Sequence, residues 1–178
     1  MMKNVLTTLL FILMACTTYA QSIKQNEVDP FKKVRKIETS FEQINGNKMG
    51  ITFGKNIWLA FRQVDDRNYL RLKWCTNGAA AIREGAEIIF LTDKGETITF
   101  KTIEDVIAGR GEGTVGLGGS ALLGLDIYAV GDCSALAGKT ITALRIYTTD
   151  GYVDFQLSEK VSKKINKTYE VFAEAVNK

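Results

Sequence analysis

Runs in which apolar and polar residues alternate recur along most of this chain, and they limit what it can fold into. In the stretch YLRLKW at residues 69–74, three apolar side chains fall on one side of an extended chain, while Arg71 and Lys73 fall on the other. Successive side chains of a β-strand point to opposite faces, so this pattern is typical of a strand with one buried and one solvated face. The chain is therefore expected to build an antiparallel sheet.

Turn residues separate these runs and predict hairpins between them. Asp93-Lys94-Gly95 lies between two alternating runs, and Asp150-Gly151 is a pair that favours the positive backbone angles of a two-residue hairpin turn. One helical turn is expected at residues 132–137. The alternation predicts strands at residues 33–44, 49–53, 57–64, 68–75, 87–91, 97–101, 103–107, 123–130, 140–148 and 152–157.

The period of the apolar residues changes after Ser158. Val161, Ile165, Phe172 and Val176 recur at the spacing of one helix face, and Ser158 is a residue type preferred at a helix N-cap. The predicted fold class is therefore mainly β, an antiparallel sandwich or partly closed barrel with one C-terminal helix.

The N-terminus predicts export from the cytoplasm. Residues 1–20 have a basic start, an apolar middle of about ten residues and a small residue at the end, as a secretory signal peptide has. A second interpretation stays open, because the residues before Cys16 resemble the box that precedes a lipid-modified cysteine. Residues 21–30 are polar and predict a flexible leader, and residues 31–178 predict a single β-rich domain. Both interpretations place this domain in the periplasm, outside the cell or on a lipid anchor.

The composition excludes several kinds of chemistry. The chain contains no histidine, so hydrolases of the common triad type and zinc enzymes with histidine ligands are excluded. Its formal net charge is +3 with basic residues spread along the chain, which gives no reason to expect nucleic acid. Cys75 and Cys133 leave two alternatives open, a disulfide formed in an oxidising compartment or two buried thiols. No metal site is expected.

A glycine-rich segment, GRGEGTVGLGGSALLG at residues 109–124, holds seven of the chain's 16 glycines. Gly111, Gly113 and Gly116 match the spacing of a dinucleotide-binding turn, but a strand rather than a helix is predicted after them. We therefore expect no cofactor, and we expect the glycines to serve a main chain that bends or passes close to another backbone. A loop of this kind can also present polar groups to a ligand, and the candidates are Arg110, Glu112, Thr114 and Ser120.

Other polar and aromatic residues are assigned mainly structural roles. The neighbouring carboxylates Asp65-Asp66 and Glu104-Asp105 are expected in turns and on the surface, because adjacent strand residues face opposite sides. The outward sheet face is expected to be solvated, and as a polar binding surface it would use Arg71, Lys73, Arg145, Tyr147 and Asp154. The expected core aromatics are Trp58, Phe61, Trp74, Phe90, Phe100, Tyr128 and Phe155.

The glycine-rich segment, the hairpin LRIYTTDGYVDFQL and the lysine-rich helix after it resemble a group of uncharacterised secreted bacterial proteins. The resemblance covers roughly residues 86–165 and implies a shared β-rich fold, without an activity or a functional residue. The leading hypothesis is an exported, non-enzymatic module that binds a macromolecule or glycan of the cell envelope. The alternatives are a calycin-like carrier of a small apolar molecule, which needs an internal cavity, and a carboxylate-based hydrolase, which needs two converging carboxyls.

Overall fold

The computed structural model describes residues 21–46, 56–76, 78–115 and 123–178. The fold is mainly β, with one large antiparallel sheet and a C-terminal helix, as the sequence predicts. The strands are β1 (Ile23–Val28), β2 (Arg35–Thr39), β3 (Glu42–Asn45), β4 (Ile57–Val64), β5 (Arg67–Cys75), β6 (Ala81–Ile82), β7 (Glu87–Thr92), β8 (Thr97–Thr102), β9 (Val106–Ile107), β10 (Gly109–Arg110), β11 (Leu123–Val130), β12 (Ile141–Thr148) and β13 (Gly151–Gln156). The helices are the short 3-10 helix η2 (Cys133–Leu136) and the α-helix α2 (Glu159–Val176).

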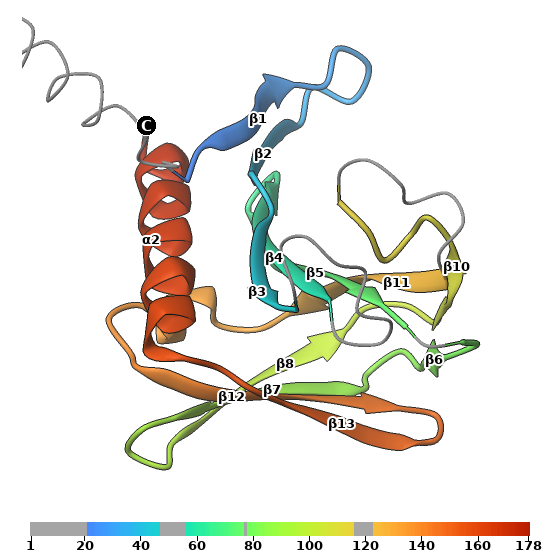
Figure 1. The fold of residues 1–178 in the computed structure, drawn as a ribbon. Helices are drawn as coiled ribbons and strands as arrows, with labels where there is room; N and C mark the ends of the chain where they lie inside the picture. The colour runs from blue at the N-terminus through green and yellow to red at the C-terminus, as the bar shows by residue number, and fades with distance from the viewer. Residues whose placement is uncertain (1–20, 47–55, 77, 116–122) are drawn as a thin grey trace, which may run out of the picture.

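The large sheet runs in the order β1-β2-β4-β5-β11-β8-β7-β12-β13, with β3 beside β4 and β10 beside β11. Its two halves turn toward each other around a common core (Figure 1). Trp74 of β5 meets Phe155 of β13 edge-on, with ring centroids 5.7 Å apart. Within the described ranges the outer strands β1 and β13 do not pair with each other, so the sheet is an open barrel rather than a closed one.

Helix α2 packs along the inner side of β2, β3 and β4 and reaches β12 (Figure 1). Ser158 is its N-cap and accepts a hydrogen bond from the Val161 N–H, as the sequence predicts. Ile165 and Phe172 are buried, and Phe172 stacks on Phe61 of β4 with ring centroids 5.7 Å apart. The helix therefore covers the core at the open side of the sheet and lies on the inner face of β4, away from its outer face.

The N-terminal part of the fold differs from the prediction. Residues 21–30 are not a flexible leader, because β1 lies within them and pairs antiparallel with β2. The predicted strand 33–44 is two strands, β2 and β3, which pair with different parts of β4. Of the predicted strand 103–107 only Val106–Ile107 is extended and paired. The predicted signal peptide with Cys16, the strand 49–53, Gly116 and Ser120 lie outside the described residues.

The disulfide alternative is wrong, because Cys75 and Cys133 form no disulfide among the residues that the structure describes. Cys75 is opposite Gly124 at one end of the β5–β11 pair, whereas Cys133 follows β11 at its other end. A strand rises about 3.3 Å per residue, so the length of β11 separates the two sulfurs by far more than a disulfide spans. Both are buried thiols.

Alkylation should confirm this arrangement. Burial raises the pKa of the Cys133 thiol to about 12, which lowers the fraction of reactive thiolate at pH 8 by roughly a thousandfold relative to an ordinary cysteine. We expect iodoacetamide to leave Cys133 unmodified in the folded protein and to modify both thiols in denaturant without a reductant. Intact mass measures both results, and a thiol that stays blocked in denaturant until reduced would contradict the structure.

In the described part of the glycine-rich segment, the glycines allow the main chain to bend and to pass close to another backbone, as the sequence predicts. Gly111 has a φ of 78°, a left-handed conformation that favours glycine. Gly113 and Gly124 pass so close to each other and to the Trp74 carbonyl that a Cβ on Gly113 would overlap this oxygen.

No helix in the described ranges is long and apolar enough to cross a membrane.

Candidate site on the outer face of the sheet

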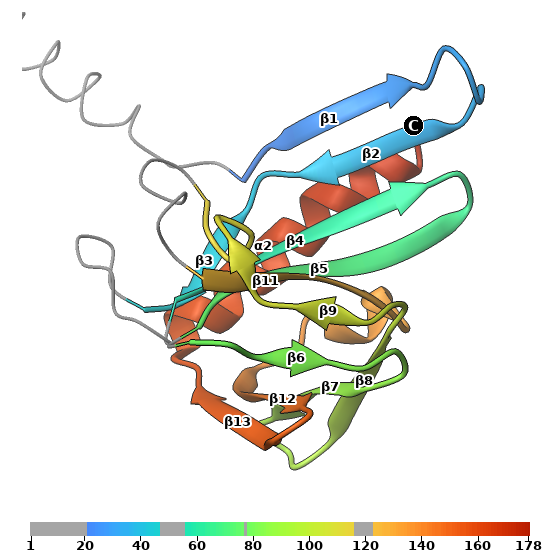
Figure 2. The ribbon, with the colours of Figure 1, turned by 90° about the vertical axis from the view of Figure 1, so that its right-hand side faces the viewer.

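A cluster of charged side chains lies on the face of the sheet opposite α2, the face turned toward the viewer in Figure 2. Arg71 of β5 is its centre and donates to Glu38 at 2.9 Å and to Asp126 at 2.9 Å. Arg62 of β4 donates to the same Glu38 carboxylate at 3.0 Å. We call the Arg71 cluster the six residues Glu38, Arg62, Arg71, Lys73, Asp126 and Tyr128.

Strand register brings these residues together from four strands. Glu38 is opposite Arg62 across β2 and β4, and Tyr128 is opposite Arg71 across β11 and β5. Their sequence neighbours Ile37, Phe61, Leu70 and Ile127 are fully buried on the core side. The alternation that builds the core therefore places every polar member of the cluster on the same outer face.

Aromatic rings cover the cluster. The Arg71 guanidinium lies 4.8 Å from the Tyr128 ring centroid and 5.1 Å from that of Phe41. The Tyr128 hydroxyl also meets Arg62 Nη1 at 3.3 Å. Burial raises the pKa of the Tyr128 hydroxyl above its ordinary value. The quadrupole of each aromatic ring attracts the Arg71 cation.

The cluster is sheltered and carries excess positive charge. The exposed fraction of the side chain is 3% for Glu38 and 14% for both Arg71 and Asp126. Burial by itself lowers the pKa of Arg71, but its hydrogen bonds to Asp126 and the charges of Asp126 and Glu38 outweigh burial and raise it. Three cations of the cluster, Arg62, Arg71 and Lys73, stand against two carboxylates. The exposed Lys24 adds a fourth cation 3.7 Å from Glu38, and Glu104 in the hollow beside the cluster adds a third carboxylate, which leaves one positive charge in excess. This face therefore favours an anionic group.

A shallow hollow of about 270 Å³ lies at the edge of the cluster. Its lining combines two tyrosine rings, one arginine, one carboxylate and two aliphatic side chains, contributed by Arg62, Val64, Tyr69, Ile103, Glu104 and Tyr128. Arg62 Nη1 donates hydrogen bonds to Glu38 and to the Tyr128 hydroxyl, and the Arg62 side chain forms part of the wall of this hollow. A ligand there would meet aliphatic side chains, two flat rings, the Arg62 cation and the Glu104 carboxylate.

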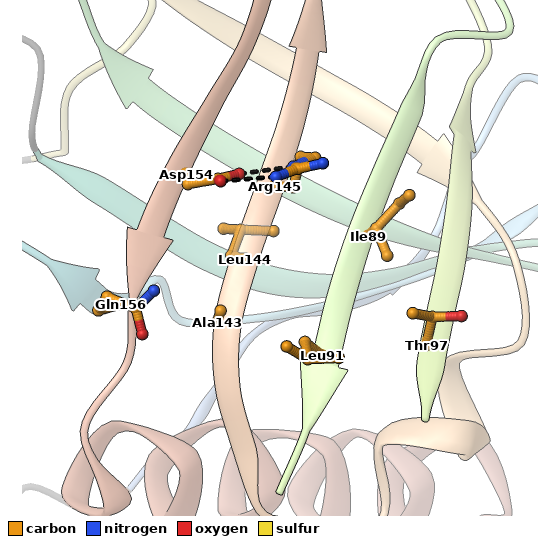
Figure 3. A pocket seen from close by; sticks show the side chains of 8 residues that line it. All are labelled: Ile89, Leu91, Thr97, Ala143, Leu144, Arg145, Asp154 and Gln156. Atoms are coloured by element: carbon orange, nitrogen blue, oxygen red, sulfur yellow. Dashed lines mark hydrogen bonds and ion pairs between the residues drawn. The ribbon is translucent and has the colours of Figure 1, made fainter. Parts of the chain in front are cut away.

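A second hollow, of about 300 Å³, lies on the outer face of the other half of the sheet. Figure 3 shows Leu91 and Gln156 on either side of Ala143, with the paired side chains of Arg145 and Asp154 above. The small Ala143 side chain leaves the gap, and Ile89 completes the apolar floor. A third hollow, of about 390 Å³, lies between β3 and the start of α2 and is lined mainly by polar groups.

The residues that were predicted from the sequence to bind a ligand lie in different parts of the structure. Arg110 and Glu112 are exposed in the glycine-rich segment, and the Thr114 hydroxyl donates to the Gly111 carbonyl at 3.0 Å. None of these three lines one of the three hollows described above. Arg71 and Lys73 do lie together in the Arg71 cluster. The others nominated on the outer face, Arg145, Tyr147 and Asp154, lie together near the second hollow.

Sequence reasoning missed four contributors to this face, Glu38, Phe41, Arg62 and Asp126. It also assigned Trp58 and Tyr128 to the core, whereas both are half-buried and lie on the outer face. The alternating pattern could have placed both on the outer face, because residues two or four apart in a strand share a face. Tyr128 is two residues from Asp126, and Trp58 is four residues from Arg62. The pairing of β11 with β5 was not available from local sequence, and only that pairing brings Asp126 to Arg71.

Several comparisons bear on the identity of this site. No three histidine, cysteine, aspartate or glutamate side chains gather as metal ligands in the described part of the chain. No protein-family model, no curated protein and no solved structure matches this chain. The proposed function therefore depends on the residues of the site alone.

Proposed function

We propose that the protein is an exported, non-enzymatic module that binds an acidic glycan or other polyanion of the cell envelope through the Arg71 cluster and the adjoining hollow. The observation that carries the proposal is the excess of one positive charge on this face, with two partly buried arginines beside flat aromatic rings. Arginine and aromatic side chains are also the residues that most often supply binding energy at protein surfaces.

The chemistry of the cluster favours binding over catalysis. Glu38 and Asp126 are the two carboxylates of the Arg71 cluster, and Arg71 lies between them and bonds to both. Neither of them lines one of the three hollows. A hydrolase would need two carboxyl groups presented to a substrate rather than bonded to the same arginine.

The apolar carrier has less support than the binding module. Phe61, Trp74, Phe90, Phe100 and Phe155 are buried together in the core, as expected from the sequence. None of them lines one of the three hollows, all of which include exposed or half-buried surface residues. A carrier would need the core aromatics to line an enclosed cavity.

Affinity chromatography on immobilised heparin, used as a model polyanion, tests the proposal. Replacing Lys24 and Lys73 with glutamine removes two positive charges from the face while keeping Glu38 and Asp126 bonded to arginine. We expect this variant to elute at clearly lower salt, because fewer counterions are displaced on binding. Arg62→Gln is expected to weaken binding about tenfold through loss of one charged contact.

A matched control separates this face from simple net charge. Lys163 and Lys167 lie on the exposed side of α2, so replacing both with glutamine removes the same charge from the opposite side of the sheet. The control variant should elute near the wild-type salt concentration. Equal shifts for the two double variants, or no retention of the wild-type protein, would overturn the proposal.

A further inference from the structure

We propose that strand β13 pairs antiparallel with β13 of a second copy of this chain, so that the sheets of two molecules join into one. β13 is the last strand of the large sheet, and no described strand lies beyond it (Figure 1). This interface lies on the half of the sheet away from the Arg71 cluster, so the inference is independent of the proposed function.

The backbone of β13 has donors and acceptors directed at the open edge. Thr148 and Gly151 close the two-residue turn of the β12–β13 hairpin, and the Leu157 N–H donates to the Thr142 carbonyl at 2.8 Å. Hydrogen bonding alternates along an antiparallel pair, so Gly151, Val153 and Phe155 bond to β12. The N–H and C=O groups of Tyr152, Asp154 and Gln156 therefore point away from it.

The two edges of the sheet differ in how they are protected. β1 carries a register shift between Ile23 and Gln25, an exposed Lys24 within it, and Pro30 just after its end. Bulges, lysines and prolines are the devices that keep an edge strand from pairing with another chain. β13 has a regular ladder over its whole length and contains neither lysine nor proline. Among the described strands, β13 is therefore the less protected of the two edges.

Charge favours one of two neighbouring registers for this pairing. Asp154 is the one charged residue of β13, and Arg145 already neutralises it through two hydrogen bonds of 2.7 Å. A twofold axis through Asp154 would place two aspartates opposite each other, which is unfavourable. An axis through Val153 places Tyr152 of each copy opposite Asp154 of the other and forms four backbone hydrogen bonds. Of these two registers, the pairing is therefore expected in the one centred on Val153.

The same edge carries a projecting ring and a hollow that can receive it. The Tyr152 ring lies 3.9 Å from the Arg145 guanidinium, and the residue is 56% exposed. Opposite Asp154, Tyr152 of the second copy would lie beside the hollow that Asp154, Gln156 and Ala143 line (Figure 3). A twofold axis makes this contact twice, so each molecule contributes the ring and the hollow.

Sedimentation velocity over a wide concentration range tests the pairing with two variants of one residue. Asp154→Ala removes the carboxylate and keeps the outward N–H, whereas Asp154→Pro removes both and leaves the bonds to β12 in place. We expect the wild-type protein and Asp154→Ala to form dimers as concentration rises. Asp154→Pro should stay monomeric at concentrations at least tenfold higher.

Amide hydrogen exchange tests the same point without a substitution, in case Asp154→Pro does not fold. The amides of Tyr152 and Asp154 should exchange slowly at high protein concentration and rapidly at low concentration, while Val153 and Phe155 stay protected at both. A wild-type protein that remains monomeric, an Asp154→Pro variant that dimerises like Asp154→Ala, or exchange at Tyr152 and Asp154 that ignores concentration would each overturn the proposal.

Discussion

Replacing Glu38 with glutamine is expected to lower the free energy of unfolding by about 3 kcal/mol, because it breaks a buried ion pair and leaves the cations without their partner. Glu38 accepts hydrogen bonds from Arg71 and Arg62, and its side chain is only 3% exposed. Glutamine keeps the shape of the side chain but turns one acceptor oxygen into a donor that faces guanidinium donors. Urea unfolding followed by circular dichroism measures the change in midpoint.

The matched control lies on the other half of the sheet. Arg145 and Asp154 also form an arginine–carboxylate pair with two hydrogen bonds, but both side chains are more than a third exposed. Solvent screens such a pair, so Asp154→Asn is expected to shift the unfolding midpoint much less than Glu38→Gln. If the two substitutions have equal effects, the outer face around Arg71 is not sheltered as the structure shows it.

This cluster shows which part of the molecule the sequence can predict. The alternation YLRLKW identified both faces of β5, and the structure buries Leu70, Leu72 and Trp74 while Arg71 and Lys73 face outward. Strand limits and hairpins are local properties, since they depend on side-chain period and turn residues a few positions apart. The second hairpin and the start of α2 at Glu159 were predicted for that reason, although the turn residues are Thr149 and Asp150 rather than Asp150 and Gly151, because Gly151 already pairs with Thr148.

Strand neighbours far apart in the chain were beyond local reasoning. β11 follows the glycine-rich segment but pairs mainly with β5, about fifty residues earlier, and this pairing alone places Asp126 beside Arg71. The polar leader is a similar case. Residues 23–28 have few apolar side chains, but β2 offers them a hydrogen-bonding edge, so tertiary context decides that they form β1. A candidate site built from four strands therefore emerges only from the fold.

Replacing Gly113 with alanine is expected to destabilise the protein by about 3 kcal/mol, an effect typical of severe overpacking. The added Cβ would overlap the Trp74 carbonyl oxygen and lie 2.6 Å from the Gly124 Cα. Both obstacles are backbone atoms of the paired strands β5 and β11, so neither can swing away as a side chain would. Differential scanning calorimetry should show a melting temperature lower by roughly 6–12 °C.

Gly78→Ala is the matched control, because a Cβ at residue 78 meets no atom within 4 Å and the glycine has no positive φ. Its expected effect is within about 0.5 kcal/mol of zero. The comparison also separates the two explanations of the glycine-rich segment, since a segment that served a ligand would lose binding in Gly113→Ala at unchanged stability. A melting temperature for Gly113→Ala equal to that of Gly78→Ala would show that the backbones of Gly113 and Trp74 are not in contact, and the structural role of this glycine would be wrong.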